Sequence, residues 1–308
     1  MKTVPLPMEI AIVGAGKTGR TLGRLARLAG YTVGPVVCRT RAHAEEAAAF
    51  IGAGRPGTEP EGAALTLLAV PDGEIRAAAR TLRVPAGAVV AHTCATYGAE
   101  ALRPHRPAGA LHPLRSFADP ARAAELFPGT ACAVDGDPEA AEALERLVRA
   151  IGGVPLRVRG DRKALYHAAA VFASNYVVVV LEAALRLFEK AGVGRPEALR
   201  ALAPLAAGTL ANVESVGIPE ALTGPVERGD EATVRRHVEA LSSEAPELAG
   251  TYAALARLAI EVALAKGSID AGAGGRLSGA LGSVESVAVV VRRRRETSRR
   301  RKASERKG

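Results

Sequence analysis

Short apolar runs alternate with helical patterns through the first half of the chain. The first run, residues 9–13, has the length of a buried strand, and the pattern after it at 18–29 has helical periodicity. Strands alternating with helices predict an α/β fold, namely a doubly wound, mostly parallel sheet. Further strands are expected at 31–38, 64–70, 88–92, 110–114, 130–134 and 154–158, and further helices at 42–51, 74–82 and 138–151.

The second half of the chain is predicted to be all helical. Its helices are expected at 163–191, 196–206, 209–216, 231–241 and 246–265, and no run there has the character of a strand. Residues 268–291, rich in Gly, Ala, Ser and Val, favour neither helix nor strand. The predicted organisation is therefore a dinucleotide-binding domain at residues 1–159, a helical domain for substrate binding or dimerisation at 160–267, and a terminal segment at 268–308.

A glycine motif, Gly14-Ala15-Gly16-Lys17-Thr18-Gly19, stands between the first strand and the first helix. In that context Gly14 permits a tight turn, Gly16 lets the backbone approach a pyrophosphate, and Gly19 lets the helix pack closely on the strand. The helix N-terminus offers free N–H groups to the phosphates. The motif predicts a dinucleotide site; the alternative is a structural glycine-rich turn.

The end of the second strand indicates which dinucleotide is bound. NAD sites usually place an acidic residue there for the ribose 2′-hydroxyl, whereas this chain has Arg39-Thr40-Arg41. A guanidinium can hold a 2′-phosphate through paired hydrogen bonds, so the expected cofactor is NADP(H). Val70 and Pro71, at the end of the third strand, are included in the expected cofactor site. The alternative is that the arginines are simply solvated.

Composition and charge narrow the setting of the protein. Of the 308 residues 48% are hydrophobic and 3% aromatic, which fits a globular core and gives no aromatic platform for nucleic-acid bases. The net charge is +9, but residues 292–308 hold ten Lys or Arg and two Glu, so the remainder is close to neutral. The basic tail is predicted to be disordered. Nucleic acid is an expected partner only through this tail. The alternative is that the tail is a solvated terminus without a partner.

The sequence has three widely spaced cysteines. It shows no signal peptide and no set of residues with metal-ligand spacing. These features predict a cytoplasmic protein without a disulfide framework or a metal site. The most apolar stretch, residues 168–181, is too short for a membrane span.

Polar residues on the long apolar helix are the candidate catalytic groups. Lys163, His167 and Ser174 fall on one side of a helical wheel, and Asn175 lies one residue further round. Buried polar groups without partners are costly, so such a cluster indicates a site, although a structural role is the alternative. His112, in the sequence LHPLRSF, is a further candidate because it lies near the end of an expected strand.

Several segments, in this order, together resemble one bacterial family: GAGKTG, VVCRTR, AVPD, AHTCAT with GALHPLRSF, YHAAAVFASNY and LTGPVERGD. They resemble the family with a Rossmann-like domain followed by domain of unknown function 2520. The layout is similar to that of pyrroline-5-carboxylate reductase, ketopantoate reductase and the 3-hydroxyacid dehydrogenases, whose 6-phosphogluconate dehydrogenase C-terminal-like helical domain commonly dimerises.

The resemblance implies an NAD(P)-dependent oxidoreductase that forms a homodimer through its helical domain. The hydroxyacid dehydrogenases carry a catalytic Lys followed four residues on by an Asn; Lys163 matches the Lys, but His167 occupies the Asn position. The loop LTGPVERGD also differs from the corresponding loop of pyrroline-5-carboxylate reductase. The sequence thus predicts a reductase of a small anionic keto or imino compound. The alternatives are a ketopantoate reductase-like enzyme and a non-catalytic NADPH-binding or sensing protein.

Overall fold

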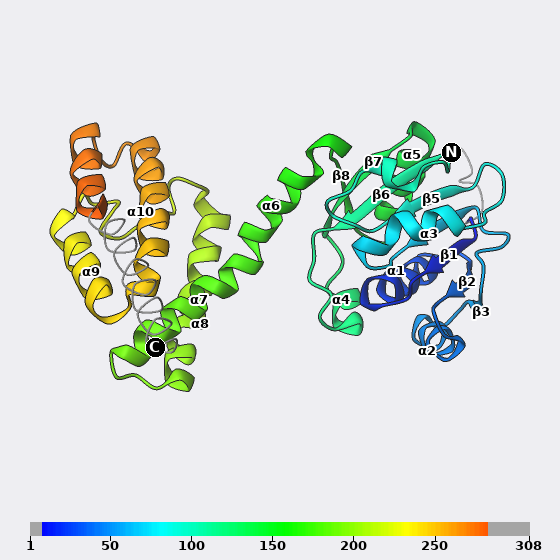
Figure 1. Cartoon of the computed structure of the whole chain (residues 1–308), viewed down its shortest axis with the longest axis horizontal. Coiled ribbons are helices and arrows are strands. Elements are labelled where there is room, and N and C mark those ends of the chain that lie inside the picture. Colours follow the sequence, from blue (N-terminus) through cyan, green and yellow to red (C-terminus); the bar gives the residue numbers. More distant parts are fainter. Residues whose placement is uncertain (1–7, 283–308) are drawn as a thin grey trace, which may run out of the picture. The chain divides into compact units, whose positions relative to one another are not determined.

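A computed structural model describes residues 8–282, and the chain divides into two compact units, Met1–Asn175 and Tyr176–Gly308. The first unit is built on one eight-stranded sheet with helices packed against it (Figure 1). Its strands are β1 (Ile10–Val13), β2 (Val33–Val37), β3 (Arg55–Gly57), β4 (Leu65–Leu68), β5 (Val89–His92), β6 (Ala108–Pro113), β7 (Ala131–Gly136) and β8 (Val154–Arg157). Its helices are α1 (Lys17–Leu28), α2 (Arg41–Ile51), α3 (Ile75–Thr81), α4 (Pro120–Glu125), α5 (Pro138–Ala150) and α6 (Lys163–Ala173), with 3₁₀ turns η1 (Asp72–Glu74), η2 (Ala99–Leu102) and η3 (Gly160–Arg162).

The strand order is β3-β2-β1-β4-β5-β6-β7-β8, and every neighbouring pair is parallel except β6 and β7. This topology confirms the predicted doubly wound, mostly parallel sheet. The chain leaves β1 toward β2 on one side and later returns to place β4 on the other side. Ligands of such sheets bind beyond the carboxyl ends of the strands at this reversal, so the topology points to the ends of β1 and β4.

Alternate residues of the central strands enter two hydrophobic cores, one on each face of the sheet. Ile10 and Ile12 pack in the core that contains Leu22 of α1, whereas Val13 packs in the core that contains Ile75 of α3. Complete burial of a side chain of this size contributes about 1.5–3 kcal/mol. The continuous apolar runs of the sequence therefore reflect strands that are covered on both sides.

The sequence did not predict β3, η2 or α4. Strand β3 is only Arg-Pro-Gly, with no apolar run, and it joins the sheet edge through backbone pairing with β2. The start of helix α4 does have a recognisable sequence signal, an aspartate N-cap followed by proline. Asp119 accepts a hydrogen bond from the backbone N–H of Arg122 at 2.8 Å, and Pro120 follows at the first helical position.

Two helix boundaries in the second half of the sequence were wrong. The single helix expected at 163–191 is broken at Ser174, which separates α6 from α7 (Asn175–Lys190). The two helices expected at 196–206 and 209–216 form one helix, α8 (Arg195–Val216), which continues through Pro204. The first compact unit extends to Asn175 and so includes α6, whereas the helical domain is predicted to begin at residue 160.

The second unit continues with α9 (Glu231–Glu244), α10 (Pro246–Lys266) and helical residues 271–282. Val234 of α9, Ile260 of α10 and Leu277 share its main hydrophobic core, so the segment after residue 268 is helical and packed at least as far as 282. The expectations for residues 283–291 and for the basic tail at 292–308 lie outside the described residues.

Two helical segments could cross a membrane by length and composition. They are Gly160–Lys190, with mean hydropathy 1.8, and Pro246–Lys266, with mean hydropathy 1.5. The first is longer than the apolar stretch recognised in the sequence. It is interrupted at Ser174, and it contains Lys163, the first residue of α6, which is buried in the first unit. The second contributes Ala253 and Ile260 to the core of its unit.

Candidate functional site

The glycine turn joins β1 to α1 at the sheet reversal, and each glycine meets a different constraint. Gly14 has φ +81°, and a Cβ there would lie 2.7 Å from the carbonyl oxygen of Ala69. A Cβ on Gly19 would lie 2.5 Å from the carbonyl oxygen of Gly14, so α1 rests directly on the turn. A Cβ on Gly16 would meet no atom within 4 Å, which leaves open space beside this backbone. The three positions fit a tight turn, close packing and room for a phosphate.

The N-terminus of α1 is available to an anion. Gly16 occupies the N-cap and provides no side-chain hydrogen bond, and the first turn contains no acidic residue. Lys17 and Thr18 stand at the first two positions of the helix. The free N–H groups and the positive end of the helix dipole therefore face the space beside Gly16.

A cavity of about 560 Å³, here called the Arg39 cavity, opens at the ends of β1 and β2. Gly14, Ala15 and Gly16 line one part of it, and Arg39 and His43 line another. Its volume lies within the range of small-molecule sites. A nucleotide whose phosphates contact the glycine turn would reach Arg39 with its ribose.

Only the first residue of Arg39-Thr40-Arg41 lines this cavity. Thr40 caps α2, where its hydroxyl oxygen accepts a hydrogen bond from the N–H of His43 at 3.3 Å. Arg41 pairs with Glu45 at 2.9 Å on the exposed side of α2. His43, which also lines this cavity, was not among the predicted site residues. The available signal was its position in the first turn of a helix that begins directly after the arginine segment.

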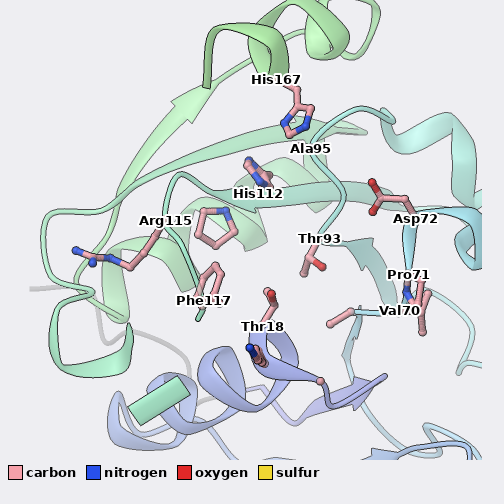
Figure 2. A pocket seen from close by; sticks show the side chains of 14 residues that line it. Thr18, Val70, Pro71, Asp72, Thr93, Ala95, His112, Arg115, Phe117 and His167 are labelled. Atoms are coloured by element: carbon pink, nitrogen blue, oxygen red, sulfur yellow. The ribbon is translucent and has the colours of Figure 1, made fainter. Parts of the chain in front are cut away.

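Figure 2 shows a second cavity of about 510 Å³, here called the histidine cavity. Gly16, Ala69, Val70 and Pro71 line both cavities, so the two continue into each other along the carboxyl edge of the sheet. Lining residues of the histidine cavity alone include Lys17, Thr18, Asp72, Thr93, His112, Arg115 and His167. The glycine turn and two candidate histidines thus face one space.

His112 and His167 come from β6 and α6, and their ring centroids lie 6.2 Å apart. Nδ1 of His112 is 3.0 Å from the hydroxyl of Tyr166. Burial, followed by electrostatic interaction with the nearby Lys163 and His167, lowers the pKa of His112 to about 4. His112 is therefore neutral near pH 7. Nδ1 of His167 is buried, and the described part of the chain offers it no hydrogen-bond partner.

Lys163 is completely buried and is absent from the residues that line the two cavities. Its Nζ donates a hydrogen bond to the carbonyl oxygen of Cys94 at 3.1 Å. Burial lowers the pKa of this ammonium, and the negative charge of Asp135 opposes that effect. The residues on either side of Cys94, Thr93 and Ala95, line the histidine cavity, so Lys163 acts on the cavity wall through the backbone.

Ser174 and Asn175 are exposed at the junction of α6 and α7. Neither lines the Arg39 cavity or the histidine cavity. The helical wheel placed Ser174 beside Lys163 and His167 because it assumed an unbroken helix. At Ser174 the backbone leaves helical geometry, with φ −128° and ψ −71°, so the wheel does not extend across this residue.

His92 lies beside the site but has both ring nitrogens occupied. Nδ1 accepts a hydrogen bond from the N–H of Cys94 at 3.2 Å, and Nε2 lies 3.0 Å from the carbonyl oxygen of Gly98. Burial lowers its pKa to about 4. This histidine is a neutral structural residue at the end of β5.

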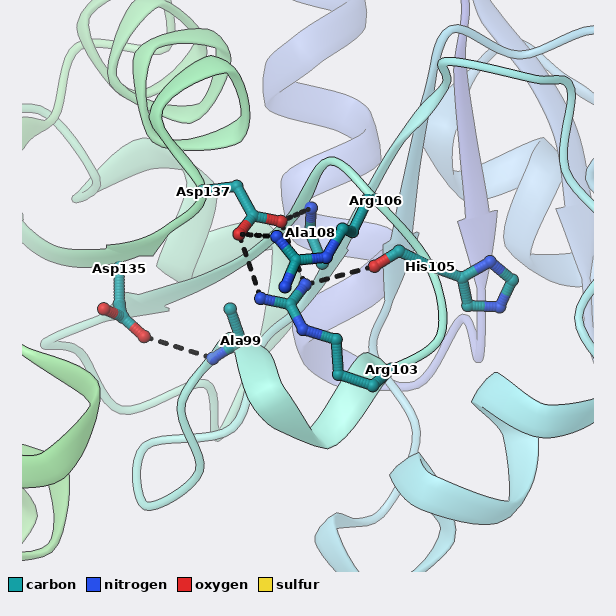
Figure 3. A network of polar contacts seen from close by, with 7 residues as sticks. All are labelled: Ala99, Arg103, His105, Arg106, Ala108, Asp135 and Asp137. Carbon is teal, nitrogen blue, oxygen red and sulfur yellow. Dashed lines mark hydrogen bonds and ion pairs between the residues drawn. The ribbon is translucent and has the colours of Figure 1, made fainter.

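Asp137 organises the loop that leads into β6, the strand that carries His112 (Figure 3). Its carboxylate accepts two hydrogen bonds from Arg103 and one from the N–H of Ala108, each at 2.9 Å. The hydrogen bonds with Arg103 hold the pKa of this carboxyl below its usual value. The network fixes the start of β6 at the end of the strand away from the cavities.

Metal and disulfide chemistry have no support in the part of the chain that the structure describes. Among residues 8–282 no group of three or more His, Cys, Asp or Glu side chains could hold a metal ion. Cys38, Cys94 and Cys132 are free thiols.

The sheet topology, the glycine turn and the adjoining cavities define a Rossmann-type nucleotide-binding domain that is followed by a helical unit. The sequence matches the Rossmann-like domain over residues 3–115 and domain of unknown function 2520 (DUF2520) over residues 130–259. The two matches confirm the resemblance that the sequence motifs indicated. No curated protein matches the sequence.

Solved structures from three bacteria share this fold. Protein TM1727 from Thermotoga maritima is 25% identical, with a TM-score of 0.70 over 83% of this chain and 99% of that one. The protein named "putative NADP oxidoreductase BF3122" from Bacteroides fragilis is 21% identical, with a TM-score of 0.65 over 83% and 98%. A 1-pyrroline-5-carboxylate reductase from Streptococcus pyogenes is 14% identical, with a TM-score of 0.57 over 71% and 86%. At these identities the last two show the fold alone.

Proposed function

We propose that this protein is an NADP(H)-dependent oxidoreductase that reduces a small anionic keto or imino compound. One observation carries the proposal: the glycine turn and the side chains of His112 and His167 line the same cavity. A hydride-transfer enzyme needs a cofactor cradle and a proton source in one space. The names of the Bacteroides and Streptococcus proteins agree with this class of activity.

The residues present fit the cofactor. The open space beside Gly16 and the uncapped start of α1 suit a pyrophosphate, while Arg39 and His43 suit a 2′-phosphate. Among residues 8–282, the acidic residues that line the Arg39 cavity are Glu46, which is paired with Arg20 at 2.9 Å, and Glu74. The nicotinamide end would then reach the histidine cavity through the shared lining at Val70 and Pro71.

The substrate is proposed to bind in the histidine cavity. Lys17 and Arg115 there outnumber the acid Asp72, which favours an anionic compound. When bound, the nicotinamide supplies a hydride to the carbonyl or imine carbon. His167 then donates a proton to the oxygen or nitrogen, which gives the alcohol or amine product. After the product is released, solvent returns a proton to His167.

A screen of NADPH consumption tests this proposal. The full chain is supplied with NADPH and a panel of 2-keto acids, including ketopantoate, and cyclic imines. We expect turnover of at least one class and a fall in kcat of about a hundredfold in His167→Ala. Ser174→Ala, at an exposed position directly after α6, is the control and should keep full activity. Tight NADPH binding without oxidation across the panel would favour a sensing protein, and full turnover by His167→Ala would remove this histidine as the donor.

We further propose a cytoplasmic homodimer formed through the helical unit. Large apolar side chains of α7 and α8 are exposed, among them Val178 at 68% and Leu205 at 66%. A second copy would remove this surface from water. Light scattering after gel filtration should give a dimer that Leu205→Glu weakens, whereas Leu28→Glu, at a 63% exposed position of α1 in the first unit, should not weaken it. A monomeric wild-type chain would contradict the proposal.

A further inference from the structure

His112 is held by a neighbour that is not among the predicted catalytic residues. The hydroxyl of Tyr166, in the first turns of α6, lies 3.0 Å from Nδ1 of His112. The two rings meet edge to face, with centroids 5.8 Å apart and an angle of 84°. Tyr166 itself does not line the histidine cavity, whereas His112 does.

We propose that Tyr166 is a positioning residue that fixes the tautomer of His112, so that Nε2 carries the proton and presents a hydrogen-bond donor to the substrate. The inference rests on the proposed function for the identity of the acceptor, the carbonyl oxygen or imine nitrogen being reduced. It assigns His112 and His167 different tasks: His112 polarises the acceptor, and His167 transfers the proton.

The direction of the hydrogen bond follows from the chemistry of the two groups. Burial raises the pKa of the Tyr166 phenol to about 12, so this hydroxyl keeps its proton at neutral pH. Among residues 8–282, His112 is the hydrogen-bond partner of this hydroxyl. For the proton of this half-buried hydroxyl, Nδ1 of the neutral His112 imidazole is the acceptor within hydrogen-bond distance. A neutral ring that accepts at Nδ1 carries its proton on Nε2.

The surroundings keep His112 neutral. The charged and titratable groups that act on it are Lys163 and His167 from α6 and Asp72 from η1. Burial is the largest cause and, with Lys163 and His167, lowers the pKa of His112 to about 4, while the negative charge of Asp72 acts in the other direction. A neutral imidazole N–H polarises a carbonyl without giving up its proton. His167 differs because the described residues offer its Nδ1 no hydrogen-bond partner that would select one tautomer.

Nitrogen NMR of the full chain, labelled with ¹⁵N-histidine at pH 7, tests the inference without any substrate. The chain has six histidines, and the His112→Gln variant assigns the His112 signals. We expect the pattern of a neutral ring protonated at Nε2, and a mixture of tautomers in Tyr166→Phe. Tyr252→Phe is the matched control, since Tyr252 holds His237 at 2.9 Å in the second unit, and it should leave the His112 signals unchanged.

The wild-type spectrum alone can overturn the inference, whether or not the variant folds. A His112 protonated at Nδ1, or charged at pH 7, contradicts it, as does a folded Tyr166→Phe protein with an unchanged tautomer. Once a substrate is known, Tyr166→Phe should lower kcat by about tenfold to a hundredfold with little change in KM. His112→Gln keeps a fixed amide donor, so adding Tyr166→Phe to it should change kcat little. If no compound in the panel is reduced, the proposed function fails while the tautomer result stands.

Discussion

The ammonium group of Lys163 donates a hydrogen bond to the backbone carbonyl of Cys94, 69 residues earlier in the chain, at 3.1 Å. The bond ties the first turn of α6 to the loop after β5. His167 follows one helical turn later and therefore reaches the histidine cavity. A lysine that the sequence marked as a candidate catalyst is placed to position the wall of the site.

Two substitutions of Lys163 should distinguish the stability contributed by packing of its aliphatic side chain from that contributed by its hydrogen bond. We expect Lys163→Ala to lower the free energy of unfolding by about 2–4 kcal/mol, because it leaves both a cavity and an unpaired carbonyl. Lys163→Met should cost about 1 kcal/mol, because it fills the space and also removes a buried charge. Urea denaturation measures both. Leu165→Ala, 69% exposed on the same helix, is the control, and equal losses in all three variants would contradict this account.

An added methyl group should reduce stability at one glycine of the turn and cofactor binding at another. Gly19→Ala places a Cβ 2.5 Å from a backbone oxygen, so the free energy of unfolding should fall by about 1–3 kcal/mol. Gly16→Ala meets no protein atom within 4 Å and should leave stability unchanged. Its methyl group would enter the space proposed for the pyrophosphate and weaken NADPH binding by roughly tenfold. Calorimetric titration and thermal melts measure both; a Gly16→Ala protein that binds NADPH normally would place the phosphates elsewhere.

Arg39 and Arg41 form a matched pair for testing the cofactor preference. Arg39 lines the Arg39 cavity, whereas Arg41 pairs with Glu45 on the exposed side of α2. Arg39→Ala should weaken NADPH binding by about 10–100-fold, because charge-assisted hydrogen bonds to the 2′-phosphate are lost, and should leave NADH binding unchanged. Arg41→Ala removes the same charge and should have little effect on either. Equal wild-type affinities for NADPH and NADH would defeat the assignment of NADP(H).

His92 should make the fold sensitive to mild acid. Its pKa is about 4 in the folded protein and near 6.5 in an unfolded chain, so between these values only the unfolded state binds the proton. Its contribution to stability is complete above about pH 6.5 and is lost as the pH falls toward 4, at about 1.4 kcal/mol per pH unit. His112 adds a similar dependence. Urea denaturation at several pH values from 7 to 4.5 gives the free energy of unfolding as a function of pH. This free energy should fall less steeply with decreasing pH in His92→Gln than in the wild-type chain. An equally steep fall would contradict the role assigned to the burial of His92.

The sequence predicted the sheet well because its signals are local. The apolar runs around Ile10 and Leu65, and the glycine motif between a strand and a helix, report burial on both faces and a turn that only certain residues can make. It failed where no local pattern exists. Strand β3 has no apolar residue except Pro56 and is formed by pairing with β2, and the break at Ser174 follows no proline or glycine.

By itself the sequence determined the doubly wound fold, the glycine cradle and the presence of arginines after the second strand, since each depends on residues close together in the chain. Only the tertiary structure decided which polar groups meet. It brought His112 and His167 into one cavity, turned Arg41 toward Glu45 and away from the Arg39 cavity, and left Ser174 and Asn175 exposed. It also buried Lys163 against Cys94 and paired His112 with Tyr166. Such contacts join residues up to 69 positions apart, and they depend on strand order and on where a helix breaks, which no local pattern records.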